Sequence, residues 1–236
     1  MCCLCPEPRH CHPDHEKLST INSGFAADQS IPYARQVNKL LRTIWAVFRS
    51  KRRPSLSITD VATMDLTVRL TDLDVQRHMN NGVYLSIADL GRFDLLIRSG
   101  FWTQMRSRGW YPVVQSATIT YRRSLELGQR YTLETRMAGI DERCVYIEQR
   151  FVVGGQVAAR LFIKGRFLQR GGGIVPMDEL ITVSGMTPEA RALPEWIGRW
   201  GDDVALPSAR SDAPSVWEEQ APRPGSSPQA SRPPDS

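Results

Sequence analysis

The sequence predicts a single α+β domain made of one strand, one long helix and four further strands. Two observations support this fold class. Apolar residues recur at helical spacing between Val83 and Ile97, which indicates a helix with a broad buried face. Four later runs alternate apolar and polar residues and are separated by glycine-containing turns, as expected of strands. A sheet packed on a central helix satisfies both patterns.

The element boundaries follow from turn and breaker residues. Residues 65–70, DLTVRL, alternate and predict the first strand. The helix is expected from about Gly82 to Ser99, ending at Gly100, and residues 101–112 are expected to form a connection. Four strands, predicted to form a meander, follow at residues 113–123, 130–138, 144–153 and 156–169. The domain therefore covers about residues 60–170.

The flanking segments differ in composition from the domain. Residues 1–34 lack hydrophobic periodicity and are expected to be disordered or an incorrectly assigned N-terminal extension. Residues 171–204 carry Trp196 and Trp200 four positions apart and are expected to dock on the domain. Residues 205–236 are rich in proline and serine, which predicts a disordered tail.

Residues 35–53 predict a basic amphipathic helix that ends before Pro54. The segment holds seven Lys/Arg and no acidic residue, so the rest of the chain carries 5 − 7 = −2 and no nucleic-acid partner is expected. The helix could lie on an anionic membrane surface, or pack on the domain or on a dimer partner, and the sequence favours neither. Its apolar stripe consists of Val37, Leu40, Leu41, Ile44, Val47 and Phe48.

Cysteine usage indicates a reducing compartment. Four of the five cysteines fall in the first eleven residues, and Cys144 is the single cysteine of the predicted domain. The spacing of the N-terminal Cys/His cluster matches no standard two-pair site, so no metal and no cofactor are expected. No apolar run reaches transmembrane length and no convincing secretory signal is present. We expect a cytoplasmic protein, with a peripheral membrane contact if residues 35–53 bind lipid.

The chemically richest stretch is the loop that feeds the long helix, TDLDVQRHMNNG at residues 71–82. A helix N-terminus offers free N–H groups that can hold an oxyanion. A nearby carboxylate such as Asp74 can act as general base or nucleophile, and His78 can orient or polarise the substrate. The structural alternative is a loop whose Asp and Asn side chains cap the helix and whose histidine is part of the core.

The run DLDVQRHMNNGVYL resembles the signature of hotdog-fold acyl-CoA thioesterases, the 4-hydroxybenzoyl-CoA thioesterase-like superfamily, and is similar to that of plant acyl-carrier-protein thioesterases. The resemblance implies a hotdog domain, a homodimer or homotetramer, and hydrolysis of acyl-CoA or acyl-carrier-protein thioesters. Asp74 then takes the catalytic position and His78 the motif histidine. Gln76 stands where the plant enzymes carry a catalytic asparagine.

The resemblance also predicts substrate contacts around the helix. Asp89 lies within about one position of an acidic residue that many relatives carry. Arg122 and Arg123 could face a CoA phosphate, or serve as solvated edge-strand charges. The remaining expected contacts are Gln76, Asn80, Asn81, Gly82 and Tyr84. The main alternative function is a non-catalytic acyl-thioester binding or membrane-associated scaffolding protein, and a hotdog dehydratase fits the loop less well. No Gly-x-Ser-x-Gly motif indicates a serine hydrolase.

Overall fold

The structure is a computed structural model that describes residues 41–208 and 211–215. The predictions for residues 1–34 and for most of the C-terminal tail lie outside the described residues. In chain order the elements are a helical stretch at residues 41–50, β1 (Ala62–Thr67), the 3₁₀ turn η1 (Leu70–Asp72), α2 (Asn81–Arg98), α3 (Phe101–Ser107), β2 (Trp110–Tyr121), β3 (Arg130–Ile140), β4 (Val145–Val153), β5 (Gln156–Gln169), α4 (Met177–Ser184), α5 (Pro188–Arg191) and α6 (Glu195–Asp203).

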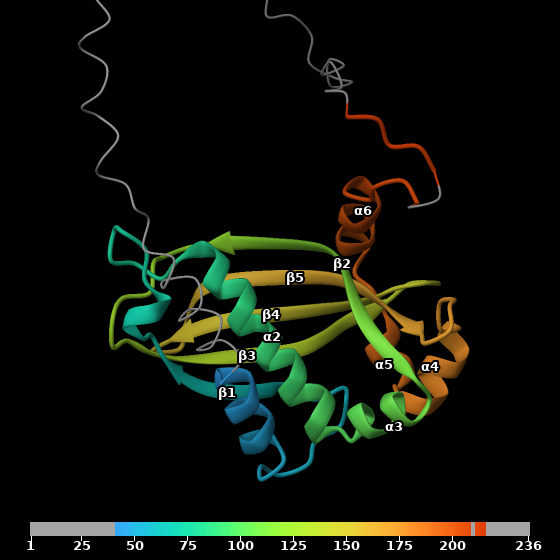
Figure 1. The fold of residues 1–236 in the computed structure, drawn as a ribbon, viewed down its shortest axis with the longest axis horizontal. Coiled ribbons are helices and arrows are strands. Elements are labelled where there is room, and N and C mark those ends of the chain that lie inside the picture. Colours follow the sequence, from blue (N-terminus) through green and yellow to red (C-terminus); the bar gives the residue numbers. More distant parts are fainter. Residues whose placement is uncertain (1–40, 209–210, 216–236) are drawn as a thin grey trace, which may run out of the picture.

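The five strands form one antiparallel sheet in the order β1-β3-β4-β5-β2. The sheet curves around α2, which lies across one face (Figure 1). This arrangement confirms the predicted α+β class and the hotdog wrapping of a sheet around a central helix.

The predicted four-strand meander is wrong for β2. Only β3, β4 and β5 follow one another in space, whereas β2 pairs with β5 at one edge and β3 pairs with β1 at the other side of the sheet. The turn at Gly128 explains the difference. Gly128 N–H donates to the Val68 carbonyl at 3.0 Å, so this turn joins the β1 side of the sheet and does not close a β2–β3 hairpin.

Smaller corrections concern element ends. Residues 101–107 form α3, not an irregular connection, because Gly100 with φ 74° reverses the chain and a new helix starts after it. The first strand covers residues 62–67 instead of 65–70. The strand expected from Val113 starts at Trp110, whose side chain is buried beneath the sheet edge.

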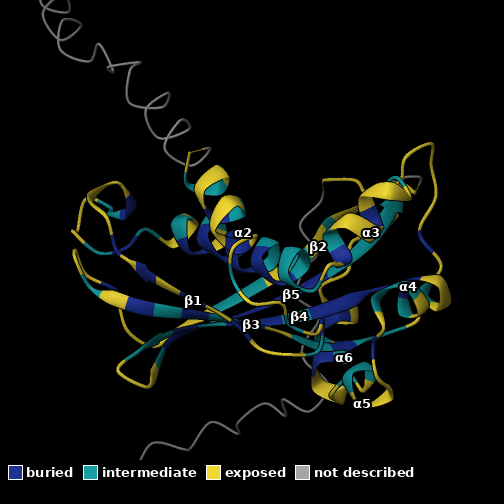
Figure 2. Cartoon of the chain, turned by 90° about the horizontal axis from the view of Figure 1, so that it is seen from below, coloured by how far each residue is buried: buried dark blue, intermediate teal, exposed yellow. Residues whose placement is uncertain are grey.

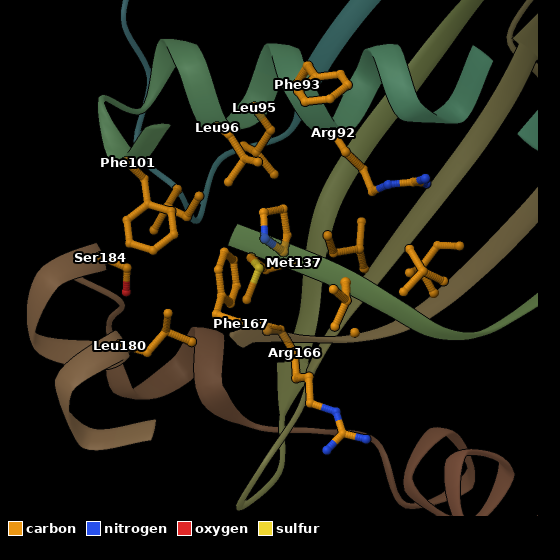
Figure 3. A pocket seen from close by; sticks show the side chains of 18 of the residues that line it. Arg92, Phe93, Leu95, Leu96, Phe101, Met137, Arg166, Phe167, Leu180 and Ser184 are labelled. Atoms are coloured by element: carbon orange, nitrogen blue, oxygen red, sulfur yellow. The ribbon is translucent and has the colours of Figure 1, made fainter. Parts of the chain in front are cut away.

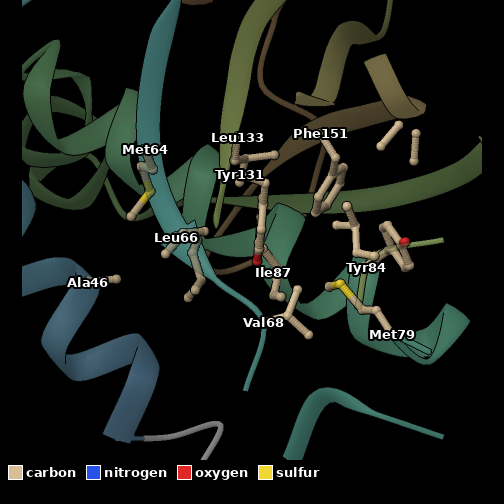
Figure 4. Packing of buried hydrophobic residues seen from close by; sticks show 14 residues of the cluster. Ala46, Met64, Leu66, Val68, Met79, Tyr84, Ile87, Tyr131, Leu133 and Phe151 are labelled. Carbon is tan, nitrogen blue, oxygen red and sulfur yellow. The ribbon is translucent and has the colours of Figure 1, made fainter. Parts of the chain in front are cut away.

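The core has two main parts along α2. The first surrounds the N-terminal half of the helix, where Tyr84 meets Phe151 edge to face with ring centroids 4.9 Å apart (Figure 4). The second surrounds the C-terminal half and includes Leu95, Phe101 and Leu180. Two separate apolar clusters under one helix fix its position along the sheet.

The opposite face of the sheet carries α5 and α6 (Figure 2), whereas Leu180 of α4 belongs to the core cluster of Leu95 and Phe101. Ile197 of α6 is buried, and the Trp196 ring meets Phe162 of β5 edge to face at 4.9 Å. Lys164 adds a polar tie, since its Nζ donates to the Gly201 carbonyl at 3.0 Å. α2 therefore lies along one face of the sheet, and α6 covers part of the other.

Candidate functional site

The loop before α2 is a tight hairpin held by backbone hydrogen bonds. Asp74 N–H donates to the His78 carbonyl at 2.8 Å, and Asn80 N–H donates to the Asp72 carbonyl at 2.8 Å. Arg77 closes the tip with φ 66°, a left-handed conformation that is uncommon for residues with a side chain. Asp74 therefore lies beside His78 in the hairpin, and the two residues of extended chain from His78 to the N-cap Asn80 span roughly 7 Å.

One oxygen of the Asp74 carboxylate is occupied within this hairpin. Oδ1 accepts the N–H groups of Gln76 at 2.9 Å and His78 at 3.2 Å. For the part of the chain that is described, no hydrogen bond reaches Oδ2. The side chain is half-buried, so the carboxylate is oriented by two backbone donors while its second oxygen stays available.

The first turn of α2 leaves one backbone donor available. Asn80 is the N-cap: its Oδ1 accepts Gly82 N–H at 2.9 Å, and its carbonyl accepts Val83 N–H at 2.9 Å. The Asn81 N–H donates no hydrogen bond to any acceptor within residues 41–208. Tyr121 Oη donates to the Asn81 carbonyl at 3.3 Å, which ties this residue to β2. Asn81 is therefore the donor that a bound anion or carbonyl can reach.

The other motif residues take different positions. His78 is half-buried and its backbone bridges to Glu126, while Gln76 is exposed at the hairpin tip. Tyr84 lies in the core, where burial raises the pKa of its hydroxyl. The structure brings Asp74, His78 and Asn80 to Gly82 into one loop and helix end, whereas Tyr84 supports that helix end from below.

Asp89 lies two turns further along α2 and forms an ion pair with Arg92. Arg92 Nη1 also donates to Gln149 Oε1 at 2.7 Å, and Gln149 is fully buried beneath the helix. Burial lowers the pKa of Arg92, and the Asp89 carboxylate counteracts that effect. This polar chain connects the exposed side of α2 with the sheet.

Two cavities lie along α2, and Asp89 and Phe93 line both of them. The helix-end cavity, about 310 Å³, is lined by Asn80, Gly82 and Ser86 on α2 and by Arg42 of the preceding helix. The apolar cavity, about 190 Å³, lies between α2 and the sheet (Figure 3). Its walls include Leu95, Leu96, Phe101, Met137, Phe167 and Leu180. Neither Asp74 nor His78 lines these cavities.

The apolar cavity was not predicted from the sequence. Its lining comes from α2, α3, α4 and four strands, and most of these residues are apolar side chains that each element would bury in any case. No local pattern distinguishes such residues from the rest of the core. Asp89 was the one predicted residue that touches this cavity, and Arg92, its partner, was missed.

Arg122 and Arg123 leave the end of β2 and reach the β4–β5 turn. Arg123 Nη2 donates to the Val153 carbonyl at 2.8 Å, and Arg122 Nη1 donates to the Val157 carbonyl at 3.3 Å. Both side chains are exposed. These contacts use one donor group of each guanidinium, so the arginines have a structural role whether or not they bind phosphate.

Two other kinds of site are absent from the described residues. No group of three His, Cys, Asp or Glu side chains there has the arrangement of a metal site. None of the helices that the structure describes has the length and apolar character needed to cross a bilayer.

Comparisons with known proteins agree with the fold and the motif. Protein THEM6 of Xenopus laevis is 46% identical over 81 residues, 34% of this chain and 39% of the frog protein. Protein THEM6 of Danio rerio is 38% identical over 113 residues, 48% of this chain and 56% of the fish protein. The matches thus span about half or less of these relatives.

A solved structure and a family model extend the comparison. The crystal structure of YbaW, a probable thioesterase from Escherichia coli, superposes with a TM-score of 0.50 at 25% identity, covering 52% of this chain and 95% of that one. The family model of the thioesterase-like superfamily matches residues 68–201, which is more than half of the chain and includes the whole loop of residues 71–82. The chain therefore belongs to the thioesterase-like superfamily.

Proposed function

We propose that the protein hydrolyses an acyl thioester, of coenzyme A or of an acyl-carrier protein, at the junction of the Asp74 hairpin and α2. The observation that carries the proposal is the presence of two available groups, the Asp74 Oδ2 in the hairpin and the Asn81 N–H at the start of the helix that follows it. Thioester carbonyls are good electrophiles, so one carboxylate and one oxyanion donor suffice for the reaction.

The proposed reaction uses each group once. The thioester oxygen accepts a hydrogen bond from Asn81 N–H and gains negative charge as the carbonyl carbon is attacked. Asp74 removes a proton from the attacking water, the C–S bond breaks, and the thiolate leaves and takes up a proton. Asp74 as direct nucleophile is the variant route, in which water then releases the acyl group. His78 positions the hairpin or the substrate.

The cavities along α2 support a lipophilic substrate. The helix-end cavity is lined by Asn80 and Gly82 at one end, and Asp89 lines both this cavity and the apolar cavity. The seven residues from Gly82 to Asp89 span about 10 Å of helix. An acyl chain whose carbonyl lies at Asn81 can therefore extend along α2 toward apolar walls.

We also propose that the protein forms a homodimer, or a homotetramer built from two such dimers, through the β2 edge. This edge strand of 12 residues, WYPVVQSATITY, contains no charged residue, and Tyr111, Val114 and Tyr121 are exposed on it. Edge strands of monomers usually carry charges that prevent pairing. Val114→Lys is expected to halve the mass measured by light scattering, and a wild-type monomer would contradict the proposal.

Thiol release from short, medium and long acyl-CoAs, read with a thiol reagent, tests the role of Asp74. Asp74→Asn is the sharper variant, because the amide oxygen can still accept the Gln76 and His78 N–H groups while the negative charge is lost. Turnover is expected to fall by about 10²–10⁴ with an unchanged melting curve. Asp178→Asn, an exposed carboxylate on α4, is the matched control and should keep full activity. An active Asp74→Asn protein would refute the assignment.

The Asn81 donor can be removed without losing the helix. Asn81 is the first helical residue, where proline is well tolerated, and Asn80 has the extended backbone that precedes proline, with φ −60° and ψ 136°. Asn81→Pro deletes the N–H and is expected to lower turnover by about 10²–10³. Asn81→Ala keeps the N–H and should remain active. Equal activities of the two variants would exclude this donor.

One observation favours the second candidate, a non-catalytic acyl-thioester binding protein. Asp74 and His78 line neither cavity. If the wild type binds acyl-CoA but turns over none of the three chain classes, the cavities serve binding and the hydrolase proposal fails.

A further inference from the structure

The helix of residues 41–50 packs on the domain through its polar side. Arg42 Nη1 lies 2.8 Å and 3.0 Å from the two carboxylate oxygens of Asp72. At the other end, Ser50 Oγ donates to Asp94 Oδ1 at 2.6 Å, and Arg53 Nη1 lies 3.1 Å from Asp94 Oδ2. Ion pairs and hydrogen bonds, together with the small buried Ala46, therefore attach this helix to the domain.

Two buried carboxylates determine which side of the helix faces inward. Asp72 and Asp94 are 4% and 0% exposed. Removing the cationic partner of a buried carboxylate costs more free energy than leaving an apolar side chain exposed to water. Turning the helix about its axis to bury its apolar stripe would take Arg42 away from Asp72. It would also take Ser50 away from Asp94, which would keep Arg98 of its own helix. The apolar stripe is thereby kept on the outside.

The outward side of the helix, named here the outer face, carries four large apolar residues. Their positions follow the i, i+3, i+4, i+7 spacing of one helical face. Figure 2 shows exposed residues on the outer side of this helix. The four are Leu41, Ile44, Trp45 and Phe48, which are 59%, 57%, 43% and 52% exposed. Leu41, Ile44 and Phe48 of the predicted stripe thus face away from the domain, together with Trp45, while Val47 is half-buried. The predicted stripe residues Val37 and Leu40 lie outside the described residues.

Cations border the outer face. The Arg49 guanidinium lies 5.1 Å from the centroid of the Trp45 ring, and that of Arg52 lies 3.7 Å from the centroid of the Phe48 ring. Lys51 follows, also exposed, and residues 35–53 contain no acidic residue. Burying this face in a protein interface would require a partner with counter-charges around an apolar centre. A bilayer of anionic lipids offers that combination over its whole surface.

We propose that the outer face docks on an anionic phospholipid membrane. Trp45 and Phe48 enter the boundary between headgroups and acyl chains, while Arg49, Lys51 and Arg52 bind lipid phosphates and carboxylates. The same helix contributes Arg42 to the helix-end cavity, so docking brings that cavity next to the lipid surface. The proposal does not depend on hydrolase activity.

Sedimentation of the full chain with lipid vesicles is the direct test. The wild type is expected to bind phosphatidylcholine vesicles that contain phosphatidylserine, to bind pure phosphatidylcholine vesicles far less, and to be released as the salt concentration rises. Absence of binding to the phosphatidylserine vesicles would overturn the proposal.

Two double variants that remove the same net charge distinguish binding by this particular face from attraction by the overall charge of the protein. Arg49→Gln combined with Arg52→Gln is expected to lower the vesicle partition coefficient roughly 30-fold, because each surface cation contributes about fivefold. Arg130→Gln combined with Arg143→Gln removes the same net charge from exposed positions, one in β3 and one in the β3–β4 turn, and should leave binding near wild type. Equal losses in the two double variants would refute a specific face.

A second pair tests the apolar part. Ile44→Ser combined with Phe48→Ser is expected to weaken vesicle binding by more than about tenfold. Leu206→Ser, at an 88% exposed position, is the control and should have no effect. Light scattering on the same proteins identifies the competing occupant. If the double variant has a smaller oligomeric mass than the wild type, a second copy covers the outer face and the membrane proposal is wrong.

Discussion

Gly91 lies where α2 comes closest to the sheet, and replacing it by alanine tests that contact. An added Cβ would stand 2.8 Å from Leu133 Cδ2, 2.9 Å from Gln149 Nε2 and closer still to Thr135 Oγ1. All three neighbours are buried, and Gln149 Nε2 donates to Thr135 Oγ1 at 2.9 Å and to the Ala88 carbonyl at 2.8 Å. The methyl group can be accommodated only if the helix moves away or this network breaks.

Two opposing effects set the magnitude. Overpacking of a rigid core costs about 1–3 kcal/mol, whereas alanine improves helix propensity by about 1 kcal/mol over glycine. Because three buried groups are affected, we expect Gly91→Ala to lower the free energy of unfolding by about 1–2 kcal/mol. Gly198→Ala in α6 is the matched control, since its Cβ would lie 3.6 Å from Leu193 Cδ2, an ordinary contact. That variant should gain up to about 1 kcal/mol.

Urea unfolding followed by circular dichroism measures both variants. A Gly91→Ala protein as stable as Gly198→Ala would refute the close helix–sheet contact. A double variant adds a test of mechanism: Thr135→Ala removes the nearest atom, so Gly91→Ala should cost less in that background than in the wild type. Strictly additive effects would mean that the methyl group does not meet Thr135.

Two further variants test the polar contacts. Glu148 is buried among arginines. Burial raises the pKa of its carboxyl group, but hydrogen bonds from Arg136 and Arg150 lower it, and the resulting pKa lies below the usual 4.5. Its stabilisation is thus complete above about pH 4.5 and is lost as the pH falls through the native pKa, so Glu148→Gln should cost about 1.5–3 kcal/mol at pH 7 and little in acid. A pH-independent difference would contradict this. Arg42→Ala leaves the buried Asp72 carboxylate without its cationic partner and should lower the free energy of urea unfolding by about 3–5 kcal/mol. Replacing the exposed Arg49 by alanine should lower it by less than about 0.5 kcal/mol, and equal losses would refute the ion pair.

Local features were predicted from the sequence because local forces determine them. The apolar spacing of residues 83–97 and the cap at Asn80 place α2 to within one residue at each end. Residues 156–169 form β5 over the whole predicted range. The motif around Asp74 and His78 led to the thioesterase-like family because its residues are contiguous and one hairpin holds them together.

Features that join distant segments were decided by the tertiary structure. The first such feature is the strand order. The sequence of β2 alternates like that of the other strands, and β2 lies at the edge because β3 pairs with β1 and not with β2. The apolar cavity is another, since its walls come from seven elements. The outer face is the third. Hydrophobic periodicity shows that the helix of residues 41–50 has an apolar side, but Asp72 and Asp94, far along the chain, determine that this side points outward. Burying a charge without its partner costs more than exposing apolar surface, and that comparison exists only once the chain is folded.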